Sequence, residues 1–167
     1  RGGPGPARWG ARAGAPARRL SATLPPEQRG PFRVEVIEFP GLHRGLGGGT
    51  ALALAVARAV AVETGNSDWT SPELAKRIGR GERSAVGVHG FDRGGLIVEA
   101  GKLPIDAIGP LLWHAPVPTV WRVVLYSPHA ESPWHGERDR RAFIDPSNTH
   151  DEAGLCRIIV TALMPAL

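Results

Sequence analysis

Hydrophobic and polar positions divide the chain into strand-like and helical segments separated by glycine-rich turns. Residues 32–39 alternate, with Phe32, Val34 and Val36 on one side, which is the pattern of a strand with one buried face. Residues 50–63 are alanine-rich and apolar almost all round, which predicts a buried helix. The ordered part of the chain is therefore expected to begin with a strand, followed by a glycine-rich turn and a helix.

Further elements are predicted in the second half of the chain. A helix is expected over residues 71–78, begun either by Ser71 with Pro72 at the first helical position or by a capping box of Thr70 and Glu73. The remaining predicted elements are strands over 96–98 and 120–126, and helices over 137–143 and from about residue 152 onward, where capping-box spacing precedes an apolar helical repeat.

Composition and charge narrow the class of protein. The chain has 167 residues, 42% hydrophobic and 22% charged, as in one soluble globular domain. Its net charge of +4 lies largely in arginines near the start, and no basic stripe interleaved with aromatic residues predicts a nucleic-acid interface. No apolar run is long enough for a membrane span. The single Cys156 excludes an intramolecular disulfide, and we expect a buried thiol in a cytoplasmic protein.

The chain is expected to have two parts. Residues 1–31 are rich in glycine, proline, alanine and arginine and show little apolar periodicity, so we expect a low-complexity, poorly ordered segment. Residues 32–167 carry the periodic elements, and we expect them to form one domain.

The glycine-rich turn is the first candidate for a binding site. Gly45, Gly47, Gly48 and Gly49 precede Thr50, where the helix is expected to begin. The first amides of a helix lack internal partners and attract phosphate. The spacing fits neither a Walker loop nor a dinucleotide fingerprint. A phosphate-binding loop is the hypothesis, and a mobile surface turn is the alternative.

Three sequence blocks resemble a known superfamily. The run GLGGGTALALA over 45–55 resembles the second motif of the GHMP superfamily, which includes the galactokinase, homoserine, mevalonate and phosphomevalonate kinases. The blocks GRGERSAVGVHGF over 79–91 and GGLIVEAG over 94–101 are similar to a branch that is not a kinase, the β-ribofuranosylaminobenzene 5'-phosphate synthases. The resemblance covers residues 34–167 and implies the middle half of a full protein. It also implies an α+β, two-layer GHMP-type domain with mixed strands and helices packed on one face.

Two departures bear on the choice between synthase and kinase. Gly48 stands where the branch usually has serine, and this removes a hydroxyl from the loop. Many GHMP kinases carry Ser-Gly-x-Asp, with the aspartate as base, where this chain has Ser84 to Gly87 and therefore no carboxylate. The synthase is favoured. An ATP-dependent small-molecule kinase is the alternative, and an inactive fragment or binding domain is the second alternative.

The resemblance implies a specific reaction. Phosphoribosyl diphosphate condenses with 4-aminobenzoate and releases diphosphate and carbon dioxide, an early step of methanopterin biosynthesis in one-carbon metabolism. Such chemistry needs a diphosphate cradle with Mg²⁺ and a cation for the aromatic carboxylate. The expected partners are those two substrates, or ATP for a kinase, together with a second copy in a homodimer.

Candidate roles follow from residue chemistry and the resemblance. His89 and Arg83 are the catalytic candidates, with a structural histidine and a salt-bridged arginine as the alternatives. The side chains of Asp92 and Glu99 are weighed as metal ligands against turn carboxylates, and no metal ligand is assigned. The predicted phosphate-binding residues are Gly45, Gly47, Gly48, Gly49, Thr50, Arg80 and Ser84.

Overall fold

The computed structural model describes residues 6–38, 46–126 and 151–167. It divides the chain into two compact units, Arg1–His114 and Ala115–Leu167, each described here by itself. The longer helices and the strands are α1 (Pro6–Thr23), α2 (Gly48–Glu63), α3 (Ser71–Ile78), α4 (Val86–Arg93), β1 (Leu96–Glu99), β2 (Leu111–Ala115) and α6 (Glu152–Ile158). The short helices are the 3-10 turns Pro26–Gln28 and Met164–Ala166 and the π-helix Ile159–Leu163.

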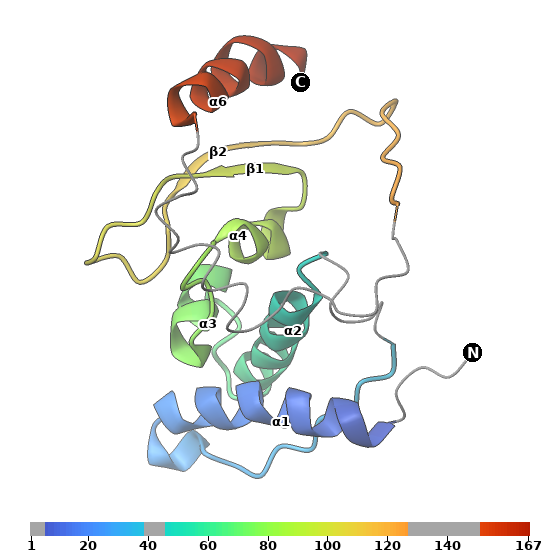
Figure 1. The fold of residues 1–167 in the computed structure, drawn as a ribbon. Coiled ribbons are helices and arrows are strands. Elements are labelled where there is room, and N and C mark those ends of the chain that lie inside the picture. Colours follow the sequence, from blue (N-terminus) through green and yellow to red (C-terminus); the bar gives the residue numbers. More distant parts are fainter. Residues whose placement is uncertain (1–5, 39–45, 127–150) are drawn as a thin grey trace. The chain divides into compact units, whose positions relative to one another are not determined.

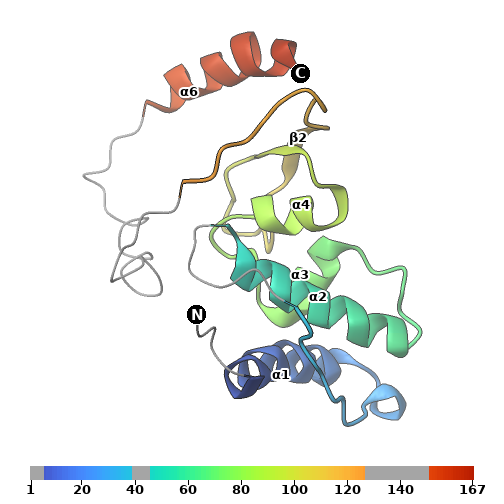
Figure 2. The same ribbon diagram turned by 90° about the vertical axis from the view of Figure 1, so that its right-hand side faces the viewer.

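The first unit places its helices on one side of a small sheet (Figure 1). β1 pairs with β2 in an antiparallel, two-stranded sheet, and α4 lies directly against β1. α2 and α3 contact α4 on one side and α1 on the other, as the turned view in Figure 2 also shows. The predicted α+β class, with helices on one face, is confirmed.

α2 supplies the centre of the core. The helix predicted over 50–63 begins two residues earlier, because Gly47 takes a left-handed φ of 66° and its carbonyl accepts hydrogen bonds from Thr50 and Ala51. The predicted burial holds for most of the helix, while the alanine positions 51, 55 and 59 remain on an exposed strip. The buried residues are Leu52, Ala53, Leu54, Val56, Ala57, Val60 and Ala61.

The expectation of a poorly ordered segment over 1–31 does not hold for its described residues. Pro6–Thr23 form α1, and Ala13, Ala17, Leu20 and Leu24 are buried against α2 and α3. These apolar positions recur every three or four residues, which places them on one helix face. The high content of glycine, proline and arginine between them hides this pattern in the sequence.

The prediction of a capping box for α3 is confirmed. Thr70 accepts a hydrogen bond from the Glu73 amide, and the Glu73 carboxylate accepts from the Thr70 amide at 2.7 Å. This hydrogen bond to the Thr70 backbone is the main cause that lowers the pKa of Glu73. At the other end Gly79 adopts a left-handed conformation and stops the helix, as expected.

The strand predictions had mixed outcomes. β1 confirms the strand expected over 96–98. Residues 32–38 are not a strand, although Phe32, Val34 and Val36 are half-buried against the core and the residues between them are exposed, as the alternation predicts. Residues 120–126 are exposed and without strand pairing, because a strand needs a hydrogen-bonded neighbour and none of the described residues provides one.

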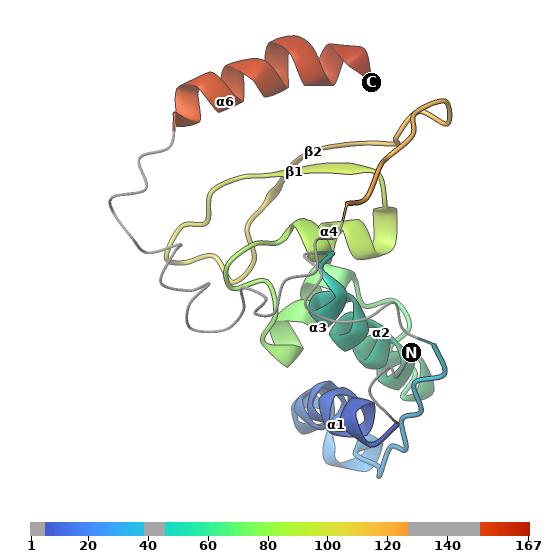
Figure 3. The same cartoon turned by 45° about the vertical axis from the view of Figure 1, so that its right-hand side comes forward.

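Two elements of the first unit have no counterpart in the sequence prediction. α4 forms although it contains Gly87 and Gly90, which have low helix propensity. Its buried Val88 and its contact with β1 provide the tertiary support. Figure 3 shows α4 beside β1 from another side. β2 follows a proline-rich connection that reads as irregular in the sequence.

The second unit contains α6 and the short helices that follow it. Asp151 begins α6 by accepting a hydrogen bond from the amide of Gly154, so the helix start expected near residue 152 is confirmed. Cys156 is exposed, which corrects the expectation of a buried thiol. The helix expected over 137–143 lies outside the described residues. Within the described part of the chain no helix has the length and apolar character for crossing a membrane.

Candidate functional site

The starts of α2 and α4 meet at one point. A β-carbon at Gly87 would lie 3.5 Å from Cγ2 of Thr50 and 3.7 Å from its Cβ, which is van der Waals contact. Thr50 belongs to the first glycine-rich segment and Gly87 to the second. The structure therefore brings together two motifs that lie 37 positions apart in the sequence.

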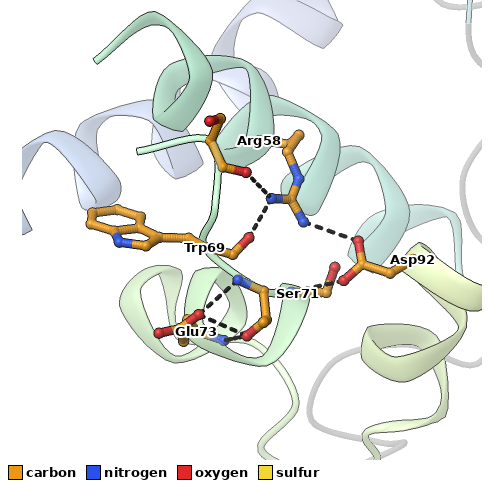
Figure 4. A network of polar contacts seen from close by, with 7 residues as sticks. Arg58, Trp69, Ser71, Glu73 and Asp92 are labelled. Carbon is orange, nitrogen blue, oxygen red and sulfur yellow. Dashed lines mark hydrogen bonds and ion pairs between the residues drawn. The ribbon is translucent and has the colours of Figure 1, made fainter. Parts of the chain in front are cut away.

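A second contact fixes the direction of these two helices (Figure 4). Arg58 of α2 forms an ion pair with Asp92 of α4, with 3.0 Å between Nη2 and Oδ1. Along α2, Arg58 lies about 12 Å beyond Thr50, and along α4, Asp92 lies about 7.5 Å beyond Gly87 at 1.5 Å per residue. The two helices thus run in the same direction, with their amino-terminal ends on the same side.

Arg58 and Asp92 also hold the chain that leads into α3. Arg58 donates hydrogen bonds to the carbonyls of Ser67 and Trp69, and Oδ2 of Asp92 accepts one from the Ser71 amide at 2.9 Å. A carboxylate at the first amides of a helix is stabilising. Asp92, which the sequence analysis weighed as a metal ligand, therefore caps α3.

Asp92 gives a pH-dependent contribution to stability. Burial works to raise the pKa of Asp92, but the hydrogen bonding with Ser71 and the charge of Arg58 together outweigh it and lower the pKa. A lowered folded-state pKa stabilises the fold above the unfolded value of about 3.9, and this contribution is lost as the pH falls through the folded-state pKa. Asp92→Asn should therefore be less stable than the unaltered chain at pH 7, and the gap should narrow below about pH 4.

Urea unfolding of both proteins across this pH range measures the gap. The expected difference is modest because the Asp92 side chain is 38% exposed. A gap of unchanged size at the lowest pH would contradict the assignment of the capping role to the ionised carboxylate.

Only some of the first amides of α2 have a hydrogen-bond acceptor among the described residues. The amides of Thr50 and Ala51 already donate to the Gly47 carbonyl at 3.0 and 3.1 Å. For the amides of Gly48 and Gly49 the described part of the chain provides no partner, as is typical of a helix start. The predicted binding residues Gly47, Gly48, Gly49 and Thr50 therefore lie together, and Gly45 lies outside the described residues.

Ser84 lies at the start of α4, close to Glu99 at the end of β1. Its hydroxyl donates to Oε1 of Glu99 at 2.5 Å, and the Ala85 amide donates to Oε2. The Ser84 oxygen in turn accepts a weak hydrogen bond from the Val86 amide at 3.3 Å. Ser84 thus acts as part of a helix cap in this structure, and its role in phosphate binding stays a prediction.

His89 contacts the segment that leads into β2. Its Nε2 lies 2.8 Å from the Gly109 carbonyl oxygen, which can only accept, so Nε2 carries the hydrogen and Nδ1 is the nitrogen left for proton transfer. His89 and Gly87 are two residues apart and therefore lie on roughly opposite faces of α4. The structure does not bring His89 to Thr50, and its catalytic role stays a prediction.

Arginines gather near the end of α3. Burial first, and then the charges of Arg19 and Arg83, lower the pKa of Arg80. Arg19 of α1 also donates to the Ile78 carbonyl at 2.9 Å. In the described residues no hydrogen bond or ion pair joins Arg80 to Thr50 or Ser84, so Arg80 groups with Arg19 and Arg83 instead.

Two residues of this region, Gly109 and Arg19, were not expected from the sequence. Gly109 is buried beside Glu99, and a β-carbon there would lie 3.2 Å from Oε2 of Glu99 and 3.2 Å from the Ala100 carbonyl oxygen. Arg19 contributes to the arginine group from α1. For Glu99, weighed only as a metal ligand or a turn carboxylate, the signal in the sequence is a carboxylate that ends an apolar strand. For Gly109 and Arg19 the sequence carries no such signal.

No group of three or more histidine, cysteine, aspartate or glutamate side chains suited to a metal ion occurs among the described residues. Asp92 and Glu99 are both engaged at helix starts. The described residues therefore do not form a ready set of ligands for Mg²⁺.

Comparison with known proteins gives a family match within the first unit. The sequence of residues 15–95 matches the family described as GHMP kinases N terminal domain. Residues 15–95 are therefore similar to a GHMP kinase N-terminal domain. The matched stretch begins within α1 and includes both glycine-rich segments.

Curated relatives match a larger part of the chain. A protein of Methanothermobacter thermautotrophicus named beta-ribofuranosylphenol 5'-phosphate synthase is 34% identical, over 90% of this chain and 49% of its own length. Proteins of the same name from Archaeoglobus fulgidus and Methanocaldococcus jannaschii are 33% and 26% identical, over 80% and 77% of this chain and 46% and 43% of their own lengths. The chain spans about half the length of these relatives. No solved structure matches it.

Proposed function

We propose that the protein is a phosphoribosyl-transferring synthase built on the GHMP domain. The observation that carries the proposal is the closeness of Thr50 to Gly87, which brings the two glycine-rich segments together. A diphosphate is the ligand that suits unpartnered amides at the start of α2. The relatives' name, beta-ribofuranosylphenol 5'-phosphate synthase, supports the same class of reaction.

The proposed reaction joins C1 of phosphoribosyl diphosphate to an aromatic acid. The bond from C1 to the diphosphate oxygen breaks, and a bond forms from C1 to the ring carbon that carries the carboxylate. The electron pair of the carbon–carboxylate bond returns to the ring as carbon dioxide leaves, so no further reactant is needed. In this reaction the amides of Gly48 and Gly49 hold the leaving diphosphate, and preorganised donors of this kind stabilise developing negative charge.

The identity of the aromatic substrate is the more specific part of the proposal. The sequence analysis predicts 4-aminobenzoate, whereas the relatives' name describes a product whose ring is a phenol. Either ring acid fits the same bond changes, because the group opposite the carboxylate takes no part in them. Arg80 and Arg83 are the proposed contacts for the carboxylate, since a guanidinium binds it in a fork. Mg²⁺ is proposed to arrive with the diphosphate and to be held mainly by its oxygens, which is a common arrangement for this ion.

A kinase is the second candidate, favoured by the description of the matched family as kinases. A kinase of this type needs a base for the substrate hydroxyl. Gly87, adjacent to Thr50, has no side chain that could act as one. This difference is the reason for preferring phosphoribosyl transfer.

An assay of the whole protein with Mg²⁺ separates the candidates. We expect release of diphosphate and carbon dioxide in equal amounts from phosphoribosyl diphosphate with 4-aminobenzoate or 4-hydroxybenzoate, and the faster acid identifies the ring substrate. Turnover of ATP to ADP with a small alcohol, and no carbon dioxide from either acid, would contradict the proposal and support the kinase.

A further inference from the structure

The carboxylate of Glu99 fills the place at the start of α4 where an anion would otherwise bind. Its two oxygens accept hydrogen bonds from the Ser84 hydroxyl and the Ala85 amide. A hydroxyl and a helix-start amide are the donors that bind phosphate oxygens in many proteins. Both are already used within the chain.

The surroundings keep this carboxylate in place. Glu99 is half-buried beside the buried Gly109. A β-carbon at Gly109 would lie only 3.2 Å from Oε2 of Glu99, so the glycine leaves room for this carboxylate. The same Gly109 accepts from His89, which lies one turn beyond Ala85 on the same face of α4. The end of β1 and the segment that leads into β2 therefore contact α4 at two successive turns.

The start of α2 differs from that of α4 in this respect. No carboxylate accepts from the amides of Gly48 or Gly49 among the described residues, although the two helix starts meet at Thr50 and Gly87. The two neighbouring starts are therefore chemically unequal: α4 has its own anion, and α2 has none in the described part of the chain.

We infer that Glu99 is a positioning residue that reserves the start of α4 and leaves the start of α2 as the one diphosphate seat of this region. The carboxylate repels a second anion from Ala85 and Val86 and holds Ser84 away from the ligand. It also fixes the segment from Ser84 to Gly87 against Thr50. The ligand class rests on the proposed function, whereas the role of Glu99 rests on its contacts.

The test is a titration of the ¹⁵N-labelled full chain with inorganic diphosphate, followed through amide chemical shifts. In the unaltered chain we expect the amides of Gly48 and Gly49 to shift and those of Ala85 and Val86 to stay. Glu99→Ala removes both the charge and the acceptor oxygens of the Ser84 and Ala85 hydrogen bonds. This variant should gain a response at Ala85 and Val86, and its stoichiometry should rise from about one diphosphate to about two.

Asp92→Ala is the matched control, since it removes the carboxylate that caps α3 and should leave Ala85 unresponsive. A shift of Ala85 in the unaltered chain, or a variant without the new response, would overturn the inference. The first of these outcomes needs no variant, so the test holds even if Glu99→Ala does not fold. Silence at Gly48 and Gly49 in both proteins would overturn the diphosphate seat of the proposed function, and Ala85 in the variant would then still decide the role of Glu99.

Discussion

Replacing Leu54 by alanine should lower the free energy of unfolding by about 2–5 kcal/mol, the usual cost of truncating a buried leucine. Leu54 is completely buried in α2, the helix that contacts α1, α3 and α4. Its loss leaves a cavity lined by several elements that cannot all move inward. Urea unfolding of the variant and the unaltered chain measures the difference.

Val62→Ala is the matched control on the same helix. Val62 is 55% exposed, so its truncation should change the free energy of unfolding by no more than about 0.5 kcal/mol. Equal losses for the two variants would contradict the placement of α2 at the centre of the core.

Gly87→Leu should weaken ligand binding without lowering the stability of the fold. A side chain at this position extends toward Thr50, whose Cγ2 lies 3.5 Å from the place of the β-carbon, and so occupies the space beside the proposed diphosphate seat. We expect binding of phosphoribosyl diphosphate to weaken about tenfold or more, which corresponds to about 1.4 kcal/mol. The stability of α4 should stay the same or rise by up to about 1 kcal/mol, because leucine is a better helix former than glycine.

Gly101→Leu is the control for this substitution. A β-carbon at Gly101 meets no atom within 4 Å, so the larger side chain should leave binding unchanged. Titration calorimetry gives the affinities, and thermal unfolding gives the stabilities. Full binding by Gly87→Leu would show that the two glycine-rich segments do not form one site.

Local chemistry made some elements of the fold predictable. The capping box of Thr70 and Glu73 and the left-handed Gly79 define α3 from neighbouring residues alone. α2 was predictable because its apolar residues are uninterrupted except at Arg58, whose long side chain reaches the Trp69 carbonyl and Asp92.

Elements that depend on distant contacts were not predictable in the same way. α4 contains two glycines and depends on Val88, Glu99 and the sheet for its support. Residues 120–126 have the composition of a strand, but pairing requires a neighbour, and the strand that pairs with β1 is β2 instead. α1 was hidden because its buried alanines are small and lie between arginines and glycines.

The candidate site shows the same division. Its glycines, Thr50 and Ser84 could be proposed from the sequence because loops that approach a ligand need small and hydroxyl-bearing residues. The contact between Thr50 and Gly87 and the use of Ser84 by Glu99 depend on how α2, α4 and β1 pack, which no spacing in the sequence encodes.

We propose that the two glycine-rich segments form one seat for the diphosphate of phosphoribosyl diphosphate. Titration calorimetry of the whole protein with phosphoribosyl diphosphate, and separately with ATP, is the decisive measurement. We expect binding of phosphoribosyl diphosphate that an excess of ATP does not displace. Binding of ATP without binding of phosphoribosyl diphosphate would contradict it.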